Sequence, residues 1–321
     1  ADFAPWDTAY YREKLQQERF HFSSEDVRPY FPLERVLSGT FQHFEKLFGV
    51  RFVANTAYPT WHRDVTAYVV FDTTDDQFLG VLYADFFPRT GKQSGAWMTT
   101  YRDQGLRDGD IKRPLVAIVC NFTKPTGDTP SLLTHEEVLT LFHEMGHAMH
   151  MMLSDVTYAS VSGTNVKWDF VELPSQIQEN WVYEPETLGL IAGHYQTGAP
   201  LPDDLIAKLR EAQQYMSGLQ GLRQMSFSLL DMTWYTTAPD HAPKTPDEVL
   251  AFEDRVMQDV TLFPRLAGPS STSFGHIFGG GYSAGYYSYK WAEVLDADAF
   301  DYFKQRGAVN GTGLYDPTTA A

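Results

Sequence analysis

Two histidines separated by three residues give the strongest chemical signal in the sequence. They stand in the run His143-Glu144-Met145-Gly146-His147. Residues i and i+4 of a helix lie on one face, so His143 and His147 can present two ring nitrogens to one metal ion. Glu144 is rotated by about 100° from His143, which places its carboxylate beside the ion, where it can take a proton from an attacking water. The pattern predicts a zinc hydrolase centre; a helix with two unrelated histidines is the alternative.

A catalytic zinc usually has three protein ligands and one open position, so a third ligand is expected. The candidate is Glu172, which follows His147 by 25 residues in the segment DFVELPSQ, residues 169–176. That interval is long enough for one helix to end and for a second helix to pack beside it. Spacing alone does not choose Glu172 over Glu179, and a carboxylate at a helix start is also favoured by the helix dipole.

Two helices must position these side chains. Thr134 and Glu137 have the spacing of a capping box before an apolar run, so the histidine-bearing helix is expected to start at Thr134. Asp169 has the same spacing with Glu172, which predicts that the second helix starts at Asp169. Asp169 is also a candidate to accept the second ring N–H of a ligating histidine, with a helix cap as the alternative.

The remaining pattern predicts an α+β fold that is predominantly α-helical, with a small and mostly antiparallel sheet. The first 50 residues have apolar residues at helical intervals, and 205–235 is expected to form one long helix or two in series. Thr245 and Pro246 predict another helix start. Strands are expected at 65–71, 78–86 and 115–122, with a turn at 73–76 and a short edge strand at 95–98.

Composition limits the partners. The formal net charge is −16 and the pI is about 4.9, so neither nucleic acid nor an anionic membrane surface is an expected partner. The single cysteine, Cys120, excludes an intrachain disulfide and suits a reducing compartment. No apolar stretch approaches the roughly 20 residues that span a bilayer. A cytoplasmic location is expected, although the chain begins at Ala1 and an upstream targeting segment stays open.

Three sequence blocks, in order, resemble the thimet oligopeptidase family of zinc metallopeptidases, which includes oligopeptidase A and peptidyl-dipeptidase. Weaker similarity extends the resemblance from about residue 50 to about residue 305. The blocks are the histidine motif at 143–150 with SGTN at 162–165, the segment DFVELPSQ at 169–176, and FGHIFGGGYSAGYYSY at 274–289.

The resemblance implies a zincin-like catalytic domain with an HExxH active-site helix and one Zn²⁺ per chain. It places the ligands at His143, His147 and Glu172, with Glu144 as the general base. The resemblance also implies substrate contacts on a glycine-rich loop at His276 and Tyr282, and backbone pairing of the substrate with an edge strand at Gly95 and Ala96.

Tyr286 and Tyr289 lie on the same loop and are the candidate catalytic tyrosines. Their i and i+3 spacing puts them on one face of a helical turn, and neutral phenols are reliable donors to a developing oxyanion. The alternative is that they fill an aromatic core. His150, three residues after His147, is expected to be packed, with a role near the substrate as the alternative.

Family members carry a helical region before the part seen here and further helix after it. We therefore expect residues 1–50 to be the remnant of an upstream helical region and 51–321 to be the catalytic domain, truncated at its C-terminal end. The missing N-terminal helical region of the same protein is a candidate partner.

The expected activity is hydrolysis of internal bonds in short peptides. A peptidyl-dipeptidase that releases C-terminal dipeptides shares all the metal motifs and is the close alternative. An inactive peptide- or metal-binding fragment is the alternative from another class. The intact Glu144 argues against that fragment, because a binding protein has no chemical need for a general base.

Overall fold

The computed structural model describes residues 4–262 and 268–320. The chain divides into two compact units, which are described separately. The first unit contains the N-terminal residues up to Phe22, the short segment Trp168–Phe170 and the stretch Glu211–Ala292. The second unit contains Ser23–Lys167, Val171–Arg210 and Glu293–Ala321.

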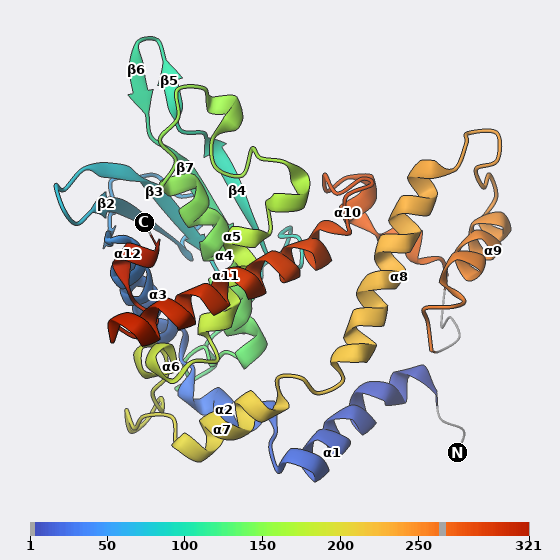
Figure 1. The fold of residues 1–321 in the computed structure, drawn as a ribbon, viewed down its shortest axis with the longest axis horizontal. Helices are drawn as coiled ribbons and strands as arrows, with labels where there is room; N and C mark the ends of the chain where they lie inside the picture. Colours follow the sequence, from blue (N-terminus) through green and yellow to red (C-terminus); the bar gives the residue numbers. More distant parts are fainter. Residues whose placement is uncertain (1–3, 263–267, 321) are drawn as a thin grey trace. The chain divides into compact units, whose positions relative to one another are not determined.

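A five-stranded sheet forms one layer of the second unit (Figure 1). Its strand order is β1-β2-β3-β7-β4, and every pair is antiparallel except β3 with β7. A separate two-stranded sheet pairs β5 with β6. The strands are β1 (Val50–Ala54), β2 (Val65–Asp72), β3 (Phe78–Asp85), β4 (Trp97–Arg102), β5 (Gly105–Arg107), β6 (Asp110–Lys112) and β7 (Leu115–Val119).

The predicted strands and the predicted turn between 73 and 76 are confirmed. β2 and β3 form an antiparallel hairpin, and the carboxylate of Asp72 accepts the backbone N–H of Thr74 at 2.7 Å, which stabilises the turn. β4 is the edge strand expected near 95–98 and begins at Trp97. The sequence did not predict β1, which follows the left-handed Gly49 at the end of α3 (Leu33–Phe48), or the hairpin β5–β6.

Helix α4 (His135–Met152) carries the histidine motif and packs on the sheet through contacts with β3, β4 and β7. Its start confirms the prediction, because Thr134 is the N-cap and forms a complete capping box with Glu137. At the other end, the Arg113 guanidinium donates to the carbonyl oxygens of Met152 at 2.6 Å and Ser154 at 3.0 Å. The bond to Met152 satisfies a carbonyl that the helix C-terminus leaves without a partner, and the bond to Ser154 holds the chain just after the helix. Both ends of the helix are therefore fixed.

Helix α5 (Leu173–Trp181) begins four residues later than predicted. Trp168–Phe170 forms only a short 3-10 turn, and the side chain of Asp169 bonds to Tyr287 instead of capping a helix. A helix capped by Asp169 would place Pro174 beyond its first turn, where proline lacks a needed N–H and its ring clashes with the preceding turn. The observed start puts Pro174 at the second helical position, so the proline sets the start of α5.

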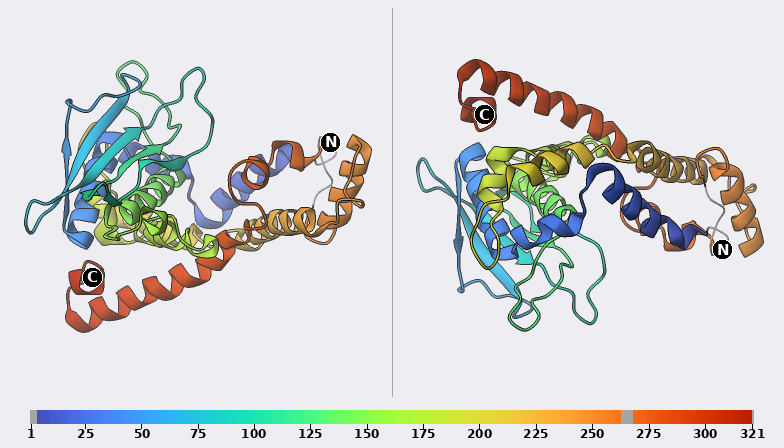
Figure 2. Two further views of the ribbon diagram at one scale, coloured as in Figure 1. Left: turned by 90° about the horizontal axis from the view of Figure 1, so that it is seen from above. Right: turned by 90° about the horizontal axis from the view of Figure 1, so that it is seen from below.

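The second unit contains further helices, of which α3 contacts α6 (Pro185–Ile191), α12 (Pro317–Ala320) and β1. A buried network ties several of them together: the His43 ring bonds to Gln178 of α5 at 2.9 Å and to the Tyr315 hydroxyl at 3.0 Å. In Figure 2 the sheet and the helices α4 and α5 lie next to each other. Besides α4 and α5, the second unit contains α2 (Ser24–Val27), α3, α6, most of α7 (Asp203–Ala212), most of α11 (Ser288–Asn310) and α12.

The described residues of the first unit form helices joined by loops. The stretch predicted as one helix or two over 205–235 is two helices, α7 and then α8 (Ser217–Thr236). The predicted start at Thr245 is confirmed by a full capping box with Glu248. The unit also contains α1 (Thr8–Phe20), α9 (Pro246–Met257) and α10 (Gly275–Phe278). Among the described residues, no helix combines the length and the apolar character that crossing a bilayer requires.

Candidate metal centre

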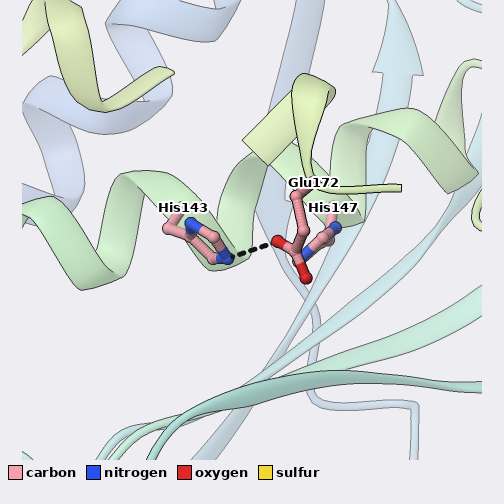
Figure 3. A group of neighbouring side chains, drawn as sticks. All are labelled: His143, His147 and Glu172. Atoms are coloured by element: carbon pink, nitrogen blue, oxygen red, sulfur yellow. Dashed lines mark ion pairs between the residues drawn. The ribbon is translucent and has the colours of Figure 1, made fainter. Parts of the chain in front are cut away.

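Three side chains of the second unit converge on one point. The potential ligand atoms of His143, His147 and Glu172 all lie within 4.8 Å of one another. One carboxylate oxygen of Glu172, Oε2, lies 3.1 Å from Nε2 of His143 and 3.3 Å from Nε2 of His147. Figure 3 shows both imidazole rings projecting from α4 toward this carboxylate. The set predicted from the sequence is therefore brought together.

The helix pair α4–α5 explains the convergence. His143 and His147 share a face of α4 as residues i and i+4, and Glu172 directly precedes the first residue of α5. Gly146 lies against the start of α5: a Cβ there would be 2.5 Å from the carbonyl oxygen of Pro174 and 2.6 Å from Cα of Ser175. The glycine of the motif thus permits the contact that brings Glu172 to the histidines.

The geometry of these donors fits zinc. Two imidazole nitrogens and one carboxylate oxygen are the donor set of many catalytic zinc sites. Ligand atoms at about 2.0–2.1 Å from a tetrahedral zinc are about 3.3 Å apart. The nitrogen–oxygen separations of 3.1 and 3.3 Å match that spacing. The donor types and these two separations therefore fit a zinc ion.

The contacts between Glu172 and the histidines shift the pKa values of Glu172 and His143 in opposite directions. Glu172 is fully buried, and burial alone would raise the pKa of its carboxyl, but the hydrogen bonds from His143 and His147 outweigh burial and hold that pKa well below its usual range. Burial likewise opposes the charged form of His143, yet its bonds to Glu172 and Glu179 raise the pKa of the imidazole well above its usual value. The buried carboxylate is thus kept ionised, which a cation ligand requires.

Glu144 lies beside these three residues and has a different environment. Its side chain is buried, and among the described residues its Oε2 atom has no hydrogen-bond partner. Burial raises the pKa of the Glu144 carboxyl, with the neighbouring histidines opposing the rise. A buried carboxylate with a free oxygen and a raised pKa suits a general base, because its affinity for a proton is increased without a competing partner.

Glu179 contacts one of the two histidines, which the sequence did not predict. The sequence left it open as a ligand beside Glu172, but in the structure its Oε1 accepts from Nδ1 of His143 at 2.7 Å. This bond fixes the ring so that Nε2 of His143 faces Glu172. Asp169, the predicted partner for a histidine, is bonded to Tyr287 instead. The local signal for Glu179 is its spacing of seven residues from Glu172, two turns along one helix face.

His150 is packed, as expected. Its Nδ1 atom is buried and has no hydrogen-bond partner among the described residues. Burial lowers the pKa of the ring to about 4, so the side chain is neutral near pH 7.

The tyrosine-bearing segment belongs to the first unit. The rings of His276, Tyr282, Tyr286 and Tyr289 form one cluster, with centroids of neighbouring rings 5.1–6.4 Å apart. Tyr286 also packs edge-on against Phe274 at 4.9 Å and Phe227 at 5.8 Å, so part of its role is to fill an aromatic core. The cluster lies in the first unit and the candidate metal centre in the second.

Gly95 and Ala96 lie in the loop that leads into the edge strand β4. The carbonyl oxygen of Gly95 accepts from Nδ2 of Asn121 at 2.8 Å. Gly95 has φ +98°, a conformation that residues with a side chain rarely adopt, so glycine is required to enter the strand in this way. β4 pairs with β7 on one side and ends the sheet on the other. Substrate pairing at this edge stays a prediction.

A helix that carries His-Glu-x-x-His, with a third carboxylate from the following helix, defines a metal-site architecture of the zincin type. A comparison with protein families agrees with that architecture and identifies the family. Residues 1–318 match the model of Peptidase family M3, and this chain belongs to that family.

Several curated proteins are similar over nearly the whole chain. Oligopeptidase A from Haemophilus influenzae is 42% identical over 312 residues, 96% of this chain and 45% of that protein. Dipeptidyl carboxypeptidase from Escherichia coli is 39% identical over 308 residues, 95% of this chain and 44% of that protein. Thimet-like oligopeptidase from Dictyostelium discoideum is 39% identical over 310 residues, 95% of this chain and 45% of that protein. The chain spans less than half the length of these relatives.

Proposed function

We propose that this chain carries the catalytic centre of a zinc metallopeptidase that hydrolyses internal bonds of short peptides. The single observation that carries the proposal is the convergence of His143, His147 and Glu172 beside the buried Glu144. Membership of Peptidase family M3 and similarity to proteins named oligopeptidase A support the substrate class.

The roles follow from the chemistry of each group. His143, His147 and Glu172 hold Zn²⁺, which when bound supplies Lewis acidity that polarises the peptide carbonyl and makes water more acidic. Glu144 accepts the proton of the attacking water and later delivers it to the leaving nitrogen. Glu179 keeps the His143 ring oriented through the bond to Nδ1.

The remaining site residues bind the substrate and stabilise charge. Tyr286 and Tyr289 donate to the oxyanion that develops on the carbonyl, because a phenol stays protonated at neutral pH. His276 and Tyr282 contact the peptide from the same cluster. Gly95 and Ala96, at the start of edge strand β4, lie where an extended peptide backbone can add to the sheet.

Release of C-terminal dipeptides is the second candidate activity. It is favoured by the similarity to dipeptidyl carboxypeptidase from Escherichia coli, which is close to that of the oligopeptidases. Such an enzyme needs a cationic or hydrogen-bonding group for the free carboxylate of the substrate. The two activities share the metal centre and differ only in what the C-terminal side of the substrate must carry.

The division of the chain at residue 50, a partner formed by an upstream helical region, and a cytoplasmic location all stay predictions. In the case of location, one similar protein is named an organellar oligopeptidase of chloroplasts and mitochondria.

The test is hydrolysis of an internally quenched peptide of about ten residues, blocked at both ends, with and without a chelator and with zinc added back. We expect cleavage that the chelator removes and zinc restores, with internal fragments found by mass spectrometry. Cleavage only of the same peptide with a free C-terminus, releasing a dipeptide, would favour the second activity. Zinc-loaded protein that cuts neither peptide would contradict the proposal and favour a binding fragment.

A further inference from the structure

The short segment Trp168–Phe170 makes its contacts with a different part of the chain from the residues on either side of it. It belongs to the first unit, although the residues before and after it belong to the second. The aromatic side chains of Trp168 and Phe170 are substantially exposed, at 38% and 42%. Trp168 and Asp169 both contact the loop at residues 279–287, which carries Tyr282 and Tyr286.

The Trp168 indole lies against two glycines of that loop. A Cβ at Gly285 would be 2.6 Å from Cδ1 and 3.2 Å from Nε1 of the indole, and a Cβ at Gly281 would be 3.6 Å from its six-membered ring. Between these glycines, the Tyr282 ring packs edge-on against the indole with centroids 4.7 Å apart. Only a residue without a side chain at position 285 allows the loop backbone to approach the indole this closely.

Asp169 adds a polar contact to the same loop. Its Oδ2 atom accepts from the Tyr287 hydroxyl at 3.2 Å. On another side, the buried carboxylate of Asp231 on α8 accepts the backbone N–H groups of Ala284 at 2.8 Å and Tyr286 at 2.9 Å. Ala284 has φ +53°, which costs free energy for a residue with a side chain, so the loop conformation is imposed by these contacts.

We propose that Trp168 and Asp169 are positioning residues that fix the tyrosine loop for catalysis. The inference rests on the proposed function, since it matters for turnover only if Tyr286 and Tyr289 act on the substrate. Tyr286 lies in the part of the loop that Trp168 and Asp231 contact, and Tyr289 follows it in the first turn of α11, with the two rings 5.1 Å apart. In sequence, the same segment leads within three residues to the ligand Glu172. A chain segment that orients the tyrosines therefore also continues into the metal centre.

A double-mutant cycle tests the docking. Gly285→Ala introduces a Cβ into the indole, and Trp168→Ala removes the indole. If the indole packs against Gly285, the double variant has space for the new Cβ that Gly285→Ala lacks. The losses of activity in the two single variants should then not be additive. Trp6→Ala removes an exposed indole of the same unit, and Gly221→Ala adds a Cβ that meets no atom within 4 Å; both are controls.

Two measurements separate this inference from the proposed function. The first is amide hydrogen exchange over residues 276–287, which needs no activity. The second is kcat and KM on the quenched peptide, at equal zinc content. For Trp168→Ala we expect faster exchange in the loop and a fall in kcat on the order of 10- to 100-fold, because small misplacements of catalytic groups are costly. The double variant should be more active than Gly285→Ala, and both controls should match the wild type.

Unchanged exchange in Trp168→Ala would overturn the docking whether or not the chain is a peptidase. Faster exchange with normal kcat would overturn the positioning role, as would strictly additive losses in the cycle. If the wild type cut no peptide at all, the proposed function would fail, and the exchange comparison alone would decide whether Trp168 holds the loop.

Discussion

Glu144 and Glu172 are both buried glutamates at one centre, yet their environments shift their pKa values in opposite directions. Burial raises the pKa of Glu144, whereas hydrogen bonds from two histidines outweigh burial at Glu172 and lower its pKa. Two carboxyl groups with divergent pKa values divide the roles of proton acceptor and permanent anion between them. The assignment of Glu144 as base and Glu172 as ligand rests on this difference as well as on geometry.

Glu179 offers a test of how the ring of His143 is oriented. Glu179→Gln replaces the acceptor of the Nδ1–H bond by a neutral group that can also present its N–H₂, so the ring is held less firmly. We expect zinc affinity to fall by about 10- to 100-fold, as is usual for such partners of metal ligands. Competition with a chromophoric chelator measures the affinity, with Glu136→Gln on the exposed face of α4 as the control. Equal affinities in both variants would remove Glu179 from the centre.

At the residue scale the sequence predicted which three side chains come together, but not the contact of Glu179 with His143. The i and i+4 spacing of His143 and His147 is a local property of one helix, so the sequence alone predicts that the two side chains share a face. Glu172 and Glu179 lie two turns apart on one side of α5, and both face α4. Which of them reaches the ligand position depends on how the two helices approach, and no local pattern carries that information.

Among the elements, the contact between α4 and α5 depends on Gly146. Gly146→Ala would press a Cβ into the backbone of Pro174 and Ser175, which cannot move aside as a flexible side chain could. We expect unfolding free energy to fall by about 1–3 kcal/mol despite the higher helix propensity of alanine, together with weaker zinc binding. Urea denaturation measures the first and chelator competition the second.

Gly189→Ala on α6 is the matched control for this variant, because its Cβ would meet no atom within 4 Å. That change should be neutral or stabilising by up to about 1 kcal/mol. If Gly146→Ala behaved like the control, the close approach of α4 and α5 would not be what brings Glu172 to the histidines.

Asp296 makes the contact between α5 and α11 sensitive to pH. Its buried carboxyl bonds to Nδ2 of Asn180 at 3.1 Å, and burial, with the charges of Glu179 and Glu293, raises its pKa to about 6. Because the acid has a higher pKa when folded, the folded state keeps the proton longer. Stability is therefore lost as the pH rises from about 4 to about 6, and it changes no further above that range.

Asp296→Asn removes this titration and keeps the shape of the side chain. Above pH 6 we expect the variant to unfold at a higher temperature than the wild type, because its unfolding free energy is higher by up to about 3 kcal/mol. Near pH 4 the two proteins should have the same stability. Thermal denaturation from pH 4 to pH 8 measures the difference. A constant offset over the whole range would show that ionisation of Asp296 is not its cause.

Two helix starts were predictable from local chemistry alone. The capping boxes at Thr134 and Thr245 begin their helices as expected, because side chain and backbone groups three residues apart satisfy each other. The same pattern at Asp169 was misleading, since Pro174 excludes a helix that starts there. β1 was missed because its short apolar run continues directly from the helical pattern of α3.

For the whole molecule, the metal is expected to contribute to stability. The free chain has a formal net charge of −16, and a bound cation would link the candidate ligands on α4 to Glu172 at the N-cap of α5. At free zinc about 100 times the dissociation constant, we expect a gain of about 2.7 kcal/mol in unfolding free energy. Differential scanning calorimetry with and without chelator measures the gain. Glu172→Gln should lose most of it, and an equal gain in that variant would place the zinc elsewhere.

The feature of the whole molecule that was hardest to predict is which segments, far apart in sequence, form one compact unit. Trp168–Phe170 contacts residues more than 100 positions later in the chain, and the segment reads locally as the start of a helix. Such contacts depend on the packing of complete helices and loops. The sequence resemblance placed the tyrosine loop in a functional role, but it gave no sign that Trp168 and Asp231 hold it.

The most direct measurement of the central claim compares the wild type with Glu144→Gln at matched zinc content. The substitution keeps the size of the side chain but removes its ability to accept a proton, so both proteins should bind one zinc ion per chain. We predict that the variant hydrolyses the quenched peptide about 10²- to 10⁴-fold more slowly. Normal turnover by zinc-loaded Glu144→Gln would contradict the account, because the proton acceptor would then have to be another group.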